Sequence, residues 1–454
     1  MNYLEGEGEL VRLDEEIHLE PDSGAIGRAI LDTRGPAIWA QNIYGYETTM
    51  TTGLMATQQR VAMAMGLPKE ASMKEQKAAF LKAYDRYPVK PRMVKDAPCK
   101  ENIVCGDDVN LFQFPIARNN INDAGPYIYK NCVITKDPDS DWVNMGVYRM
   151  QVVDCNKTSN LANPYRHWGE HFNKARQRGE PMEMAVALGT EPVFYMSAGS
   201  TIPSGWSEMD FAGALRQEPV ELVMAETVNL PVPATAEIVL EGVVRPEPRV
   251  LEGPFGEGLG AYAGTFILPV FEVNAITYRN NPIFDTLYIG RPPTESSISA
   301  LPGIIGSIEQ VLKSRFPQII EVACLYPKSN VVIQGKWNLA DEPHRVMAAL
   351  WSSRASSNDK VVTIVDEDIN PWDAADVMWA IATRTQANND LVIIPGNLAD
   401  LDPAQNLDGL SCWLGIDATK TRPPHRHKVS LWVTPPEGTD AWKEKFKKLK
   451  KGDA

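Results

Sequence analysis

Two carboxylates lie five residues apart in the segment Glu252-Gly-Pro-Phe-Gly-Glu257. Pro254 fixes its own φ and disfavours helix at Gly253, so the backbone of the segment is irregular and a ligand can approach it closely. Two carboxylates held in such a loop can differ in solvation. One can then stay ionised while the other holds a proton and acts as an acid. Taken alone, the segment is more simply a glycine-rich turn with two solvated acids.

A dinucleotide-binding loop is excluded for the residues that follow. The stretch 258–263 fits the loose pattern G-x-G-x-x-G/A. That fingerprint requires a helix directly after the glycines. Residues 265–274 are instead rich in β-branched and aromatic side chains and are interrupted by Pro269, which favours a strand.

A second candidate group lies upstream, in the segment 141–151, which contains Asn144 and Arg149. Five residues apart on a regular strand, these two side chains would point to opposite faces. A bulge or a twist is therefore needed to aim both at one ligand. An inward arginine is the natural partner of a substrate carboxylate or a catalytic glutamate, although a surface salt bridge is the simpler interpretation of Arg149 alone.

The segment His167-Trp-Gly-Glu170-His171 matches the pattern H-x-x-E-H of inverted zinc proteases. In that pattern two histidines one helical turn apart bind zinc and the glutamate acts as the base. Gly169 weakens the required helix, and the neighbouring residues are polar. These features favour an exposed helical position for His171, and the zinc site remains the rival hypothesis.

The composition of the 454-residue chain is that of an ordinary globular protein, with 44% hydrophobic and 23% charged residues. A net charge of −13 argues against nucleic acid and anionic lipid as partners. The six scattered cysteines form no C-x-x-C pair and are expected to be reduced thiols. No signal peptide or long apolar segment is recognised, so we expect a cytoplasmic protein without membrane association.

The hydrophobic patterns predict an α/β domain with a crossing segment over residues 1–116, a mainly β domain over 117–300, a linker helix over 301–317 and an α/β domain over 318–454. The many strands of the second region favour a barrel or a strongly curved sheet, whose mouth is a usual cofactor site. Its predicted strands are 127–135, 142–153, 193–197, 236–244, 266–278 and 283–289. A helix is predicted over 303–314 with Pro302 just before it, and a basic amphipathic helix ends the chain as a docked helix or an oligomer contact.

Taken together, these motifs resemble the UbiD family of prenylated-flavin-dependent decarboxylases over nearly the whole chain. The resemblance implies that Arg149, Glu252 and Glu257 form the catalytic set, and that the central domain is a split β-barrel like that of flavin reductases. It also implies a divalent metal, manganese or magnesium, on Asn144, His167 and Glu208, with potassium nearby. The implied contacts of the prenylated FMN are Asn144, Gly146, Val147, Tyr148, Arg149, Arg166, His167, Ser200 and Glu208, and the implied pocket walls are Thr294 and Ser296.

Within the family, the chain looks closest to the large subunits of hydroxybenzoate (phenolic acid) decarboxylases. One departure is Trp413, which stands where many relatives have a lysine that contacts the cofactor phosphate. Lys420 or Arg422 could replace that charge. The resemblance further implies a flavin prenyltransferase as cofactor supplier, and a homodimer or a homohexamer.

The expected function is thus a reversible, non-oxidative decarboxylation of an aromatic acid of the hydroxybenzoate type, releasing carbon dioxide. By resemblance, the prenylated flavin accepts the electrons freed as carbon dioxide leaves. Arg149 would orient the carboxylate and pair with Glu252, and Glu257 would return a proton to carbon. A heteroaryl or unsaturated acid would use the same central residues. The zinc hydrolase and a non-catalytic flavoprotein remain as alternatives from other classes.

Overall fold

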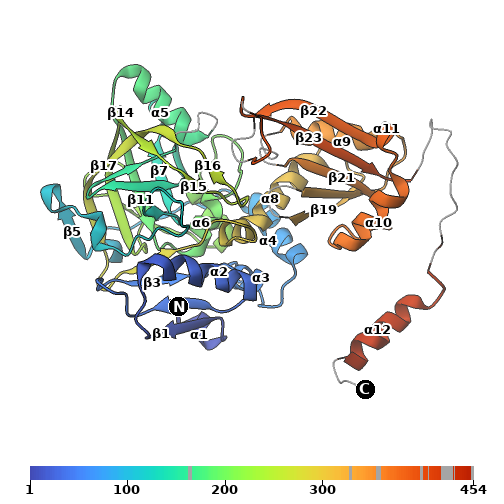
Figure 1. Ribbon diagram of the computed structural model, residues 1–454, viewed down its shortest axis with the longest axis horizontal. Coiled ribbons are helices and arrows are strands. Elements are labelled where there is room, and N and C mark those ends of the chain that lie inside the picture. The colour runs from blue at the N-terminus through green and yellow to red at the C-terminus, as the bar shows by residue number, and fades with distance from the viewer. Residues whose placement is uncertain are drawn as a thin grey trace.

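The computed structural model describes residues 1–161, 166–326, 330–353, 359–398, 402–406, 408–420, 433 and 435–450. Figure 1 shows the barrel strands beside a second sheet made by the C-terminal third of the chain, with the N-terminal elements below the barrel. The described part therefore combines α/β regions at both ends with a central β region, as the sequence predicts. In the described residues, no helix is both long and apolar enough to cross a bilayer.

The N-terminal sheet has four strands in the order β1-β2-β3-β18. Its strands are β1 (Leu10–Leu13), β2 (Ala37–Ala40), β3 (Thr49–Thr52) and β18 (Ile283–Thr286). The helices of this region are α1 (Asn2–Gly6), α2 (Gly24–Thr33), α3 (Gln58–Ala64) and α4 (Met73–Arg86). Because β18 comes from the end of the barrel region, the N-terminal and central parts share one sheet.

The central sheet has nine strands, eight of them in the order β6-β9-β10-β17-β14-β11-β7-β8, with β5 paired to β17. The strands are β5 (Asn102–Cys105), β6 (Tyr127–Ile128), β7 (Cys132–Lys136), β8 (Val143–Gly146), β9 (Met150–Asp154), β10 (Lys157–Ser159), β11 (Met182–Leu188), β14 (Ile238–Glu252) and β17 (Phe266–Tyr278). The chain passes from one end of this order to the other within three residues, twice, at 129–131 and at 147–149. Three residues span only about 10 Å. The two ends therefore lie side by side, and the sheet curls into a barrel. We call residues 129–131 and 147–149, where the two ends meet, the seam.

The seam divides two predicted strands. The strand predicted over 127–135 is split into β6 and β7, and the strand predicted over 142–153 is split into β8 and β9. Ile128 pairs with Met150 on one side of the break, and Val133 pairs with Gly146 on the other. One strand thus advances five residues while its partner advances four, which is a bulge. The irregularity that Asn144 and Arg149 require lies between them.

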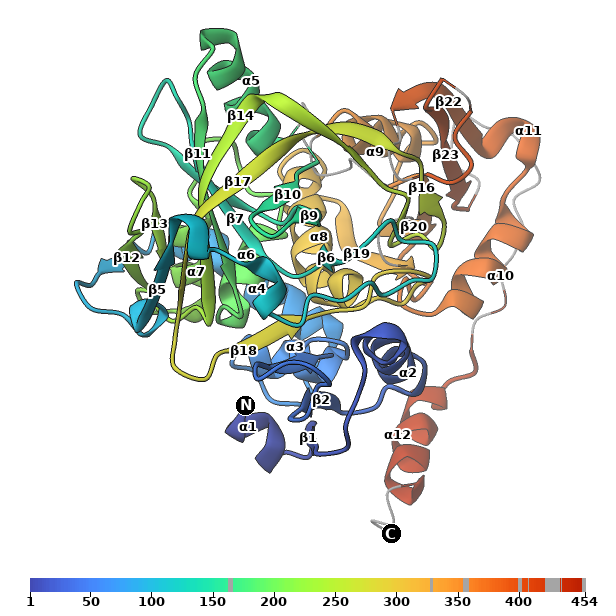
Figure 2. The ribbon, with the colours of Figure 1, turned by 60° about the vertical axis from the view of Figure 1, so that its left-hand side comes forward.

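Several shorter elements lie around the barrel strands, most of them labelled in Figure 2. They are the helices α5 (His167–Arg178), α6 (Pro192–Ala198) and α7 (Glu208–Arg216), the strands β4 (Arg92–Met93), β12 (Glu221–Met224) and β13 (Pro231–Pro233), and the pair β15 (Phe255–Gly256) with β16 (Tyr262–Ala263). Four turns are short or irregular: Leu19–Ser23, Pro98–Lys100, Gly106–Asp108 and Leu111–Gln113. The strand predicted over 193–197 was wrong, because this run is the helix α6, with Pro192 in its first turn. All five residues are buried, so no exposed face marks the helical period.

Helix α8 (Glu295–Lys313) joins the barrel to the last sheet. It starts eight residues before the predicted start at Gly303, so the prediction that Pro302 precedes the helix was wrong. The side chain of Thr294 accepts a hydrogen bond from the amide of Ser297 and fixes this earlier start. Lys77 of α4 forms buried ion pairs with Glu309 of α8 and Glu321 of the next strand, which tie three parts of the chain together.

The last sheet has five strands in the order β19-β20-β21-β23-β22. They are β19 (Ile319–Tyr326), β20 (Asn330–Gly335), β21 (Val361–Asp366), β22 (Leu391–Leu398) and β23 (Leu410–Ala418), accompanied by α9 (Glu342–Trp351), α10 (Ala374–Arg384) and α11 (Ala387–Asp390). Trp413 of β23 stacks on Trp351 with ring centroids 5.7 Å apart. The last helix, α12 (Thr439–Lys450), stands apart from this sheet in both views (Figures 1 and 2).

Candidate active site in the central barrel

Arg149 lies in the seam and meets both carboxylates of the glutamate segment. Its Nη2 donates to Oε2 of Glu252 at 2.8 Å, and its Nη1 donates to Oε1 of Glu257. The guanidinium carbon lies 4.9 Å from the ring centre of Phe255 and 5.5 Å from that of Phe266. The predicted catalytic residues therefore meet in one cluster, with an arginine between two acids and two aromatic rings.

The two glutamates differ in their surroundings. The side chain of Glu252 is fully buried, whereas 13% of the side chain of Glu257 is exposed. Oε1 of Glu252 also accepts a hydrogen bond from the hydroxyl of Tyr127 at 3.0 Å. Charged hydrogen-bond donors stabilise the anionic form of a carboxylate. Glu252 is thus buried between two hydrogen-bond donors, while the carboxylate of Glu257 has access to solvent.

The backbone of the glutamate segment is fixed by neighbouring polar groups. Gly253 has φ +88°, a conformation that favours glycine, and its amide donates to Oε1 of Gln151 at 3.2 Å. The amide of Gly256 donates to Oδ1 of Asp123 at 2.7 Å. Sequence reasoning missed Tyr127, Gln151 and Asp123, because none of them stands in a motif. The structure identifies these three residues because they form hydrogen bonds with residues of the glutamate segment.

Asn144, His167 and Glu208 lie on β8 and at the first residues of α5 and α7. Oδ1 of Asn144 is 3.0 Å from Nδ1 of His167, and Oε2 of Glu208 accepts the amide hydrogen of Met145 at 3.0 Å. The N-termini of two helices thus meet the end of one strand. Such termini carry free N–H groups and a partial positive charge, which suit a phosphate.

Glu208 is only 3% exposed. Burial raises its pKa to about 8, and none of the ion pairs between described residues includes it. A buried carboxylate that receives only backbone hydrogen bonds suits a divalent cation, which would compensate its charge. The side chains of Asn144, His167 and Glu208 therefore fit the predicted metal.

The other predicted cofactor contacts of this region follow the strand into the seam. Gly146 is buried, and a Cβ there would lie 2.6 Å from the ring of Tyr148. Val147 and Tyr148 are half-buried, and the side chain of Asn131 holds both backbone groups of Tyr148, at 3.2 Å and 2.7 Å. Arg166 is exposed just before α5.

Three predicted residues lie around helix α8. The hydroxyl of Ser200 donates to the carbonyl of Met196 at 2.6 Å, and Ser200 faces Gly303 of α8. Thr294 caps the helix, and its hydroxyl is 3.2 Å from that of Ser296. These hydrogen bonds lie within the region around α8, and the roles of the three residues in binding stay predictions.

The expectation that His171 is exposed was wrong. The ring is fully buried, and its Nδ1 lies 3.0 Å from the hydroxyl of Thr135. Burial lowers its pKa to about 4. Glu170 points elsewhere and lies 3.6 Å from Lys174. Because, in addition, no three His, Cys, Asp or Glu side chains of the described ranges gather as a metal site, the zinc-protease pattern is not supported.

Lys420 and Arg422 were the residues expected to replace the charge of a lysine at position 413, and the structure supports neither. Lys420 forms an ion pair with Asp368 at 2.9 Å, and Arg422 lies outside the described residues. Trp413 belongs to the apolar core of the last sheet. Position 413 therefore carries an aromatic side chain that stacks on Trp351, and it offers no positive charge to a ligand.

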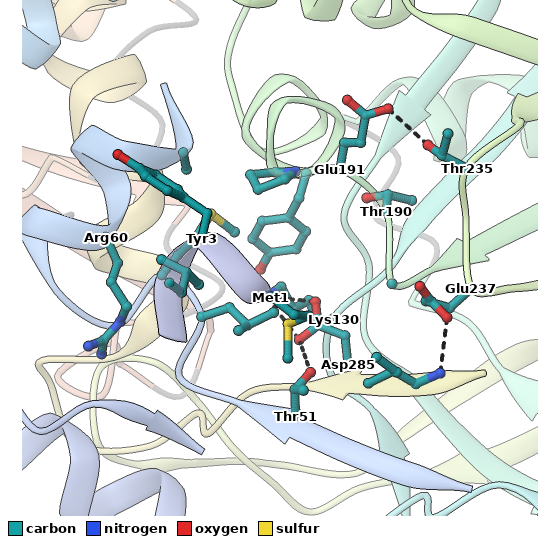
Figure 3. Close-up of a pocket in the computed structure, with 18 of the residues that line it drawn as sticks. Met1, Tyr3, Thr51, Arg60, Lys130, Thr190, Glu191, Thr235, Glu237 and Asp285 are labelled. Carbon is teal, nitrogen blue, oxygen red and sulfur yellow. Dashed lines mark hydrogen bonds and ion pairs between the residues drawn. The ribbon is translucent and has the colours of Figure 1, made fainter. Parts of the chain in front are cut away.

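A cavity of about 470 Å³ lies between the N-terminal sheet and the barrel. Figure 3 shows Lys130 and Asp285 near its centre. The ammonium nitrogen of Lys130 lies 5.6 Å from the ring centre of Tyr195. Lys130 pairs with both Asp285 and Glu295, which raises its pKa even though burial alone would lower it. None of the three catalytic candidates lines this cavity.

Sequence models of the three domains of 3-octaprenyl-4-hydroxybenzoate carboxy-lyase match the chain in order. The N-terminal domain matches residues 1–80, the Rift-related domain residues 92–292 and the C-terminal domain residues 303–418. Phenolic acid decarboxylase from Sedimentibacter hydroxybenzoicus is 35% identical, over 99% of this chain and 97% of the relative. The enzyme of the same name from Bacillus subtilis is also 35% identical, over 98% and 97%.

Solved structures give the same result. Vanillic acid decarboxylase from Sedimentibacter hydroxybenzoicus in its closed form has a TM-score of 0.92 and 34% identity, over 99% of this chain and 98% of that one. The UbiD-class enzyme HmfF from Pelotomaculum thermopropionicum, in complex with FMN, has a TM-score of 0.84 and 32% identity, over 97% of each chain. An evolved dimeric form of HmfF was solved with prenylated FMN, at a TM-score of 0.83 and 31% identity over 97% and 96%. With these matches along nearly its whole length, the chain belongs to the UbiD family of carboxy-lyases.

Proposed function

We propose that this chain is a prenylated-FMN-dependent decarboxylase of an aromatic acid, most favourably a hydroxybenzoate, and that its reaction is reversible. The main support is the position of Arg149 between Glu252 and Glu257. The names of the relatives, phenolic acid and vanillic acid decarboxylase, support the substrate class. The complex of HmfF with prenylated FMN supports the cofactor.

In this proposal Arg149 binds and orients the substrate carboxylate. Its Nη1 and Nη2 already carry one carboxylate each. A substrate carboxylate would therefore compete with Glu257 for the guanidinium, while the buried Glu252 keeps its hydrogen bond. The aromatic faces of Phe255 and Phe266 limit the access of water to the guanidinium, and a drier environment favours loss of the charged carboxylate as carbon dioxide.

Glu257 is the proposed proton donor. It is the glutamate with solvent access, so it can be reprotonated after each turnover. The donor must hold its proton while Glu252 stays ionised, and the second hydrogen bond to Glu252 from Tyr127 supports this division. In the reverse direction, the carboxylate of Glu257 would remove the proton from the ring carbon.

The cofactor phosphate is proposed to lie at the helix N-termini of α5 and α7. Asn144, His167 and Glu208 would hold Mn²⁺ or Mg²⁺ beside it, with K⁺ nearby, and Gly146, Val147, Tyr148, Arg166 and Ser200 would contact the cofactor. When bound, prenylated FMN supplies a sink for the electron pair that the departing carboxylate leaves behind. A flavin prenyltransferase would have to supply this cofactor, which adds a partner to the proposal.

The test begins with protein produced together with a flavin prenyltransferase, under controlled oxygen and with Mn²⁺ and K⁺. Its absorption spectrum and the mass of the released cofactor report binding. Carbon dioxide release is then measured from 4-hydroxybenzoate, vanillate, a furan carboxylate and cinnamate. Release from the hydroxybenzoates above all supports the proposal, and no release from any acid contradicts it. Exchange of labelled bicarbonate into the substrate tests reversibility.

Glu257→Gln is the decisive variant. The amide keeps the shape of the side chain but donates no proton to carbon, so turnover should fall by about 100- to 10,000-fold while the cofactor stays bound. Glu247→Gln is the matched control, because Glu247 lies on β14, ten residues before Glu257, with 74% of its side chain exposed. Full activity of Glu257→Gln would remove this residue from the mechanism.

A further inference from the structure

The loop from Asn119 to Ala124 lies outside the catalytic cluster and forms hydrogen bonds with the backbone of the glutamate segment. Oδ1 of Asp123 accepts the amide hydrogen of Gly256 at 2.7 Å, and the amide of Ala124 donates to the carbonyl of Pro254 at 2.9 Å. These two contacts fix the backbone directly before Glu257. We name residues 119–124 the brace.

Asp123 is a buried acid held by neutral donors. It is 3% exposed, and none of the ion pairs recorded for the described residues includes it. Its Oδ2 accepts hydrogen bonds from the hydroxyl of Tyr129 at 2.9 Å and from the amide of Asn120 at 3.0 Å. Burying an unpaired carboxylate is costly unless every hydrogen bond is made. The carboxylate therefore defines the position of each group that donates to it.

The brace is itself anchored to a third segment of the chain. The side-chain amide of Asn119 donates to the carbonyl of Leu287, and that of Asn120 donates to the carbonyl of Ile289, both at 2.9 Å. The amide of Asn119 also donates to the hydroxyl of Tyr129 at 2.9 Å. Because the brace is held independently by these contacts, it can restrain the backbone of Gly256.

Close approach of the brace requires glycine at position 256. A Cβ there would lie 2.5 Å from Nδ2 of Asn120 and 3.4 Å from Oδ1 of Asp123. Glu257 follows directly and begins a tight turn, in which its amide donates to the carbonyl of Ala261 at 2.9 Å. A shift of Gly256 would move the start of this turn and the carboxylate that it carries.

We infer that Asp123 is a positioning residue for Glu257, acting through the amide of Gly256. Asp123 touches neither substrate nor cofactor in this inference. It sets where the proposed proton donor stands relative to Arg149. The inference rests on the proposed function for its catalytic consequence, but its structural part, the restraint of the Glu257 turn, does not depend on that function.

Asp123→Leu keeps the branching of the side chain but replaces both acceptor oxygens by methyl groups. Amide hydrogen exchange of the 252–261 peptide, measured on the purified full chain without substrate, should accelerate by about 10- to 100-fold, because a buried hydrogen bond to a charged acceptor is lost. In the loaded enzyme kcat should fall by about 100-fold, since a displacement of about 1 Å of a catalytic group has this effect. The flavin content should stay within about threefold and the KM should not rise by more than this, because Arg149 keeps its contact with Glu252 and the helix N-termini are unchanged.

Two further variants and a control complete the experiment. Asp123→Asn keeps one acceptor oxygen for Gly256 and should lose less than about tenfold in kcat. Gly256→Ala pushes against the brace from the other side and should reproduce the effect of Asp123→Leu, so it decides the question if that variant does not fold. Asp137→Asn is the control, because Asp137 is also buried, at 7% exposed, and accepts the amide hydrogen of Asp139, but in a turn between β7 and β8 where it also pairs with Lys174.

Unchanged exchange of the 252–261 peptide in both Asp123→Leu and Gly256→Ala would overturn the inference. So would a fall in kcat that only follows a loss of flavin. If the unmodified protein decarboxylates no aromatic acid, the proposed function fails, and the exchange measurement still decides whether Asp123 restrains the turn.

Discussion

Tyr127 donates a hydrogen bond to Glu252 over 3.0 Å, on the oxygen that Arg149 does not use. Burial, followed by the charge of Glu252, raises the pKa of Tyr127 far above its usual range. The phenol therefore stays protonated at neutral pH and remains a donor. Each oxygen of the buried carboxylate thus has its own donor, one from strand β6 and one from the seam directly before strand β9.

Replacing Tyr127 by phenylalanine should reduce both activity and stability. The ring still packs on Phe255, but Oε1 of Glu252 loses its donor and remains buried, which costs about 1–3 kcal/mol in the free energy of unfolding. Decarboxylation should fall by about 10-fold or more, because a less stabilised anion competes for the proton of Glu257. Urea denaturation and steady-state kinetics measure the two effects. Tyr84→Phe, which removes a buried hydroxyl 2.9 Å from that of Ser307, is the control and should change stability without changing kcat.

Asn131→Ala should open the barrel seam. Asn131 is 2% exposed and holds the amide and the carbonyl of Tyr148, next to Arg149. The loss of its side chain leaves these backbone groups without that partner and should cost about 1–3 kcal/mol in the free energy of unfolding, together with a lower kcat. Asn102→Ala, at the edge strand β5, provides the comparison. Equal effects of the two substitutions would show that the seam has no special role.

His171 predicts a pH dependence of stability. Its pKa is about 4 in the folded protein and about 6.5 when unfolded, so the unfolded chain binds the extra proton between these values. Stability should be complete above pH 6.5 and should fall as the pH drops towards 4, by on the order of 3 kcal/mol. His171→Asn can still bond Thr135 but does not titrate, and should flatten this slope in urea denaturation at pH 7.0, 5.5 and 4.5. Parallel slopes for the two proteins would contradict the prediction.

Helix α12 predicts how copies of the chain associate. Trp442 and Phe446 are 54% and 61% exposed, and their ring centroids lie 5.8 Å apart on one face of the helix. We expect this face to bury itself against a second copy, in line with the proposed homodimer or homohexamer. Trp442→Glu with Phe446→Glu should lower the molar mass measured by light scattering. Lys443→Glu, which changes the charge of the helix but not its apolar face, should leave the mass unchanged.

The sequence predicts best those elements whose faces differ. Strand β17 has the predicted bounds, Phe266 and Tyr278, because its β-branched and aromatic residues end at a turn. The sequence also predicts a helix over 57–67, stopped by Gly66 and Pro68, and α3 lies within these bounds with Thr57 as its cap. The side chains of Arg149, Glu252 and Glu257 also meet, as their motif led us to expect, and their catalytic role stays a prediction. Neither composition nor periodicity indicated how they are held.

What the sequence could not predict depends on contacts between distant segments. Polar neighbours around His171 suggested that it is exposed. Helix α5 instead packs Trp168 and Phe172 against the barrel, and His171 lies on the same buried face. The seam is invisible for a similar reason, because Asn131 and Tyr148 carry no local signal for a strand break. Only the meeting of the two sheet ends requires it.

The seam also bears on how the site forms during folding. Arg149 is 103 residues from Glu252 and 108 from Glu257, with β10, β11 and most of β14 in between. Contacts at such sequence separation form slowly, because a long loop must be closed first. An intermediate that contains only the first barrel strands has the arginine without its carboxylates. The return of turnover during refolding would therefore time the closure of the barrel itself.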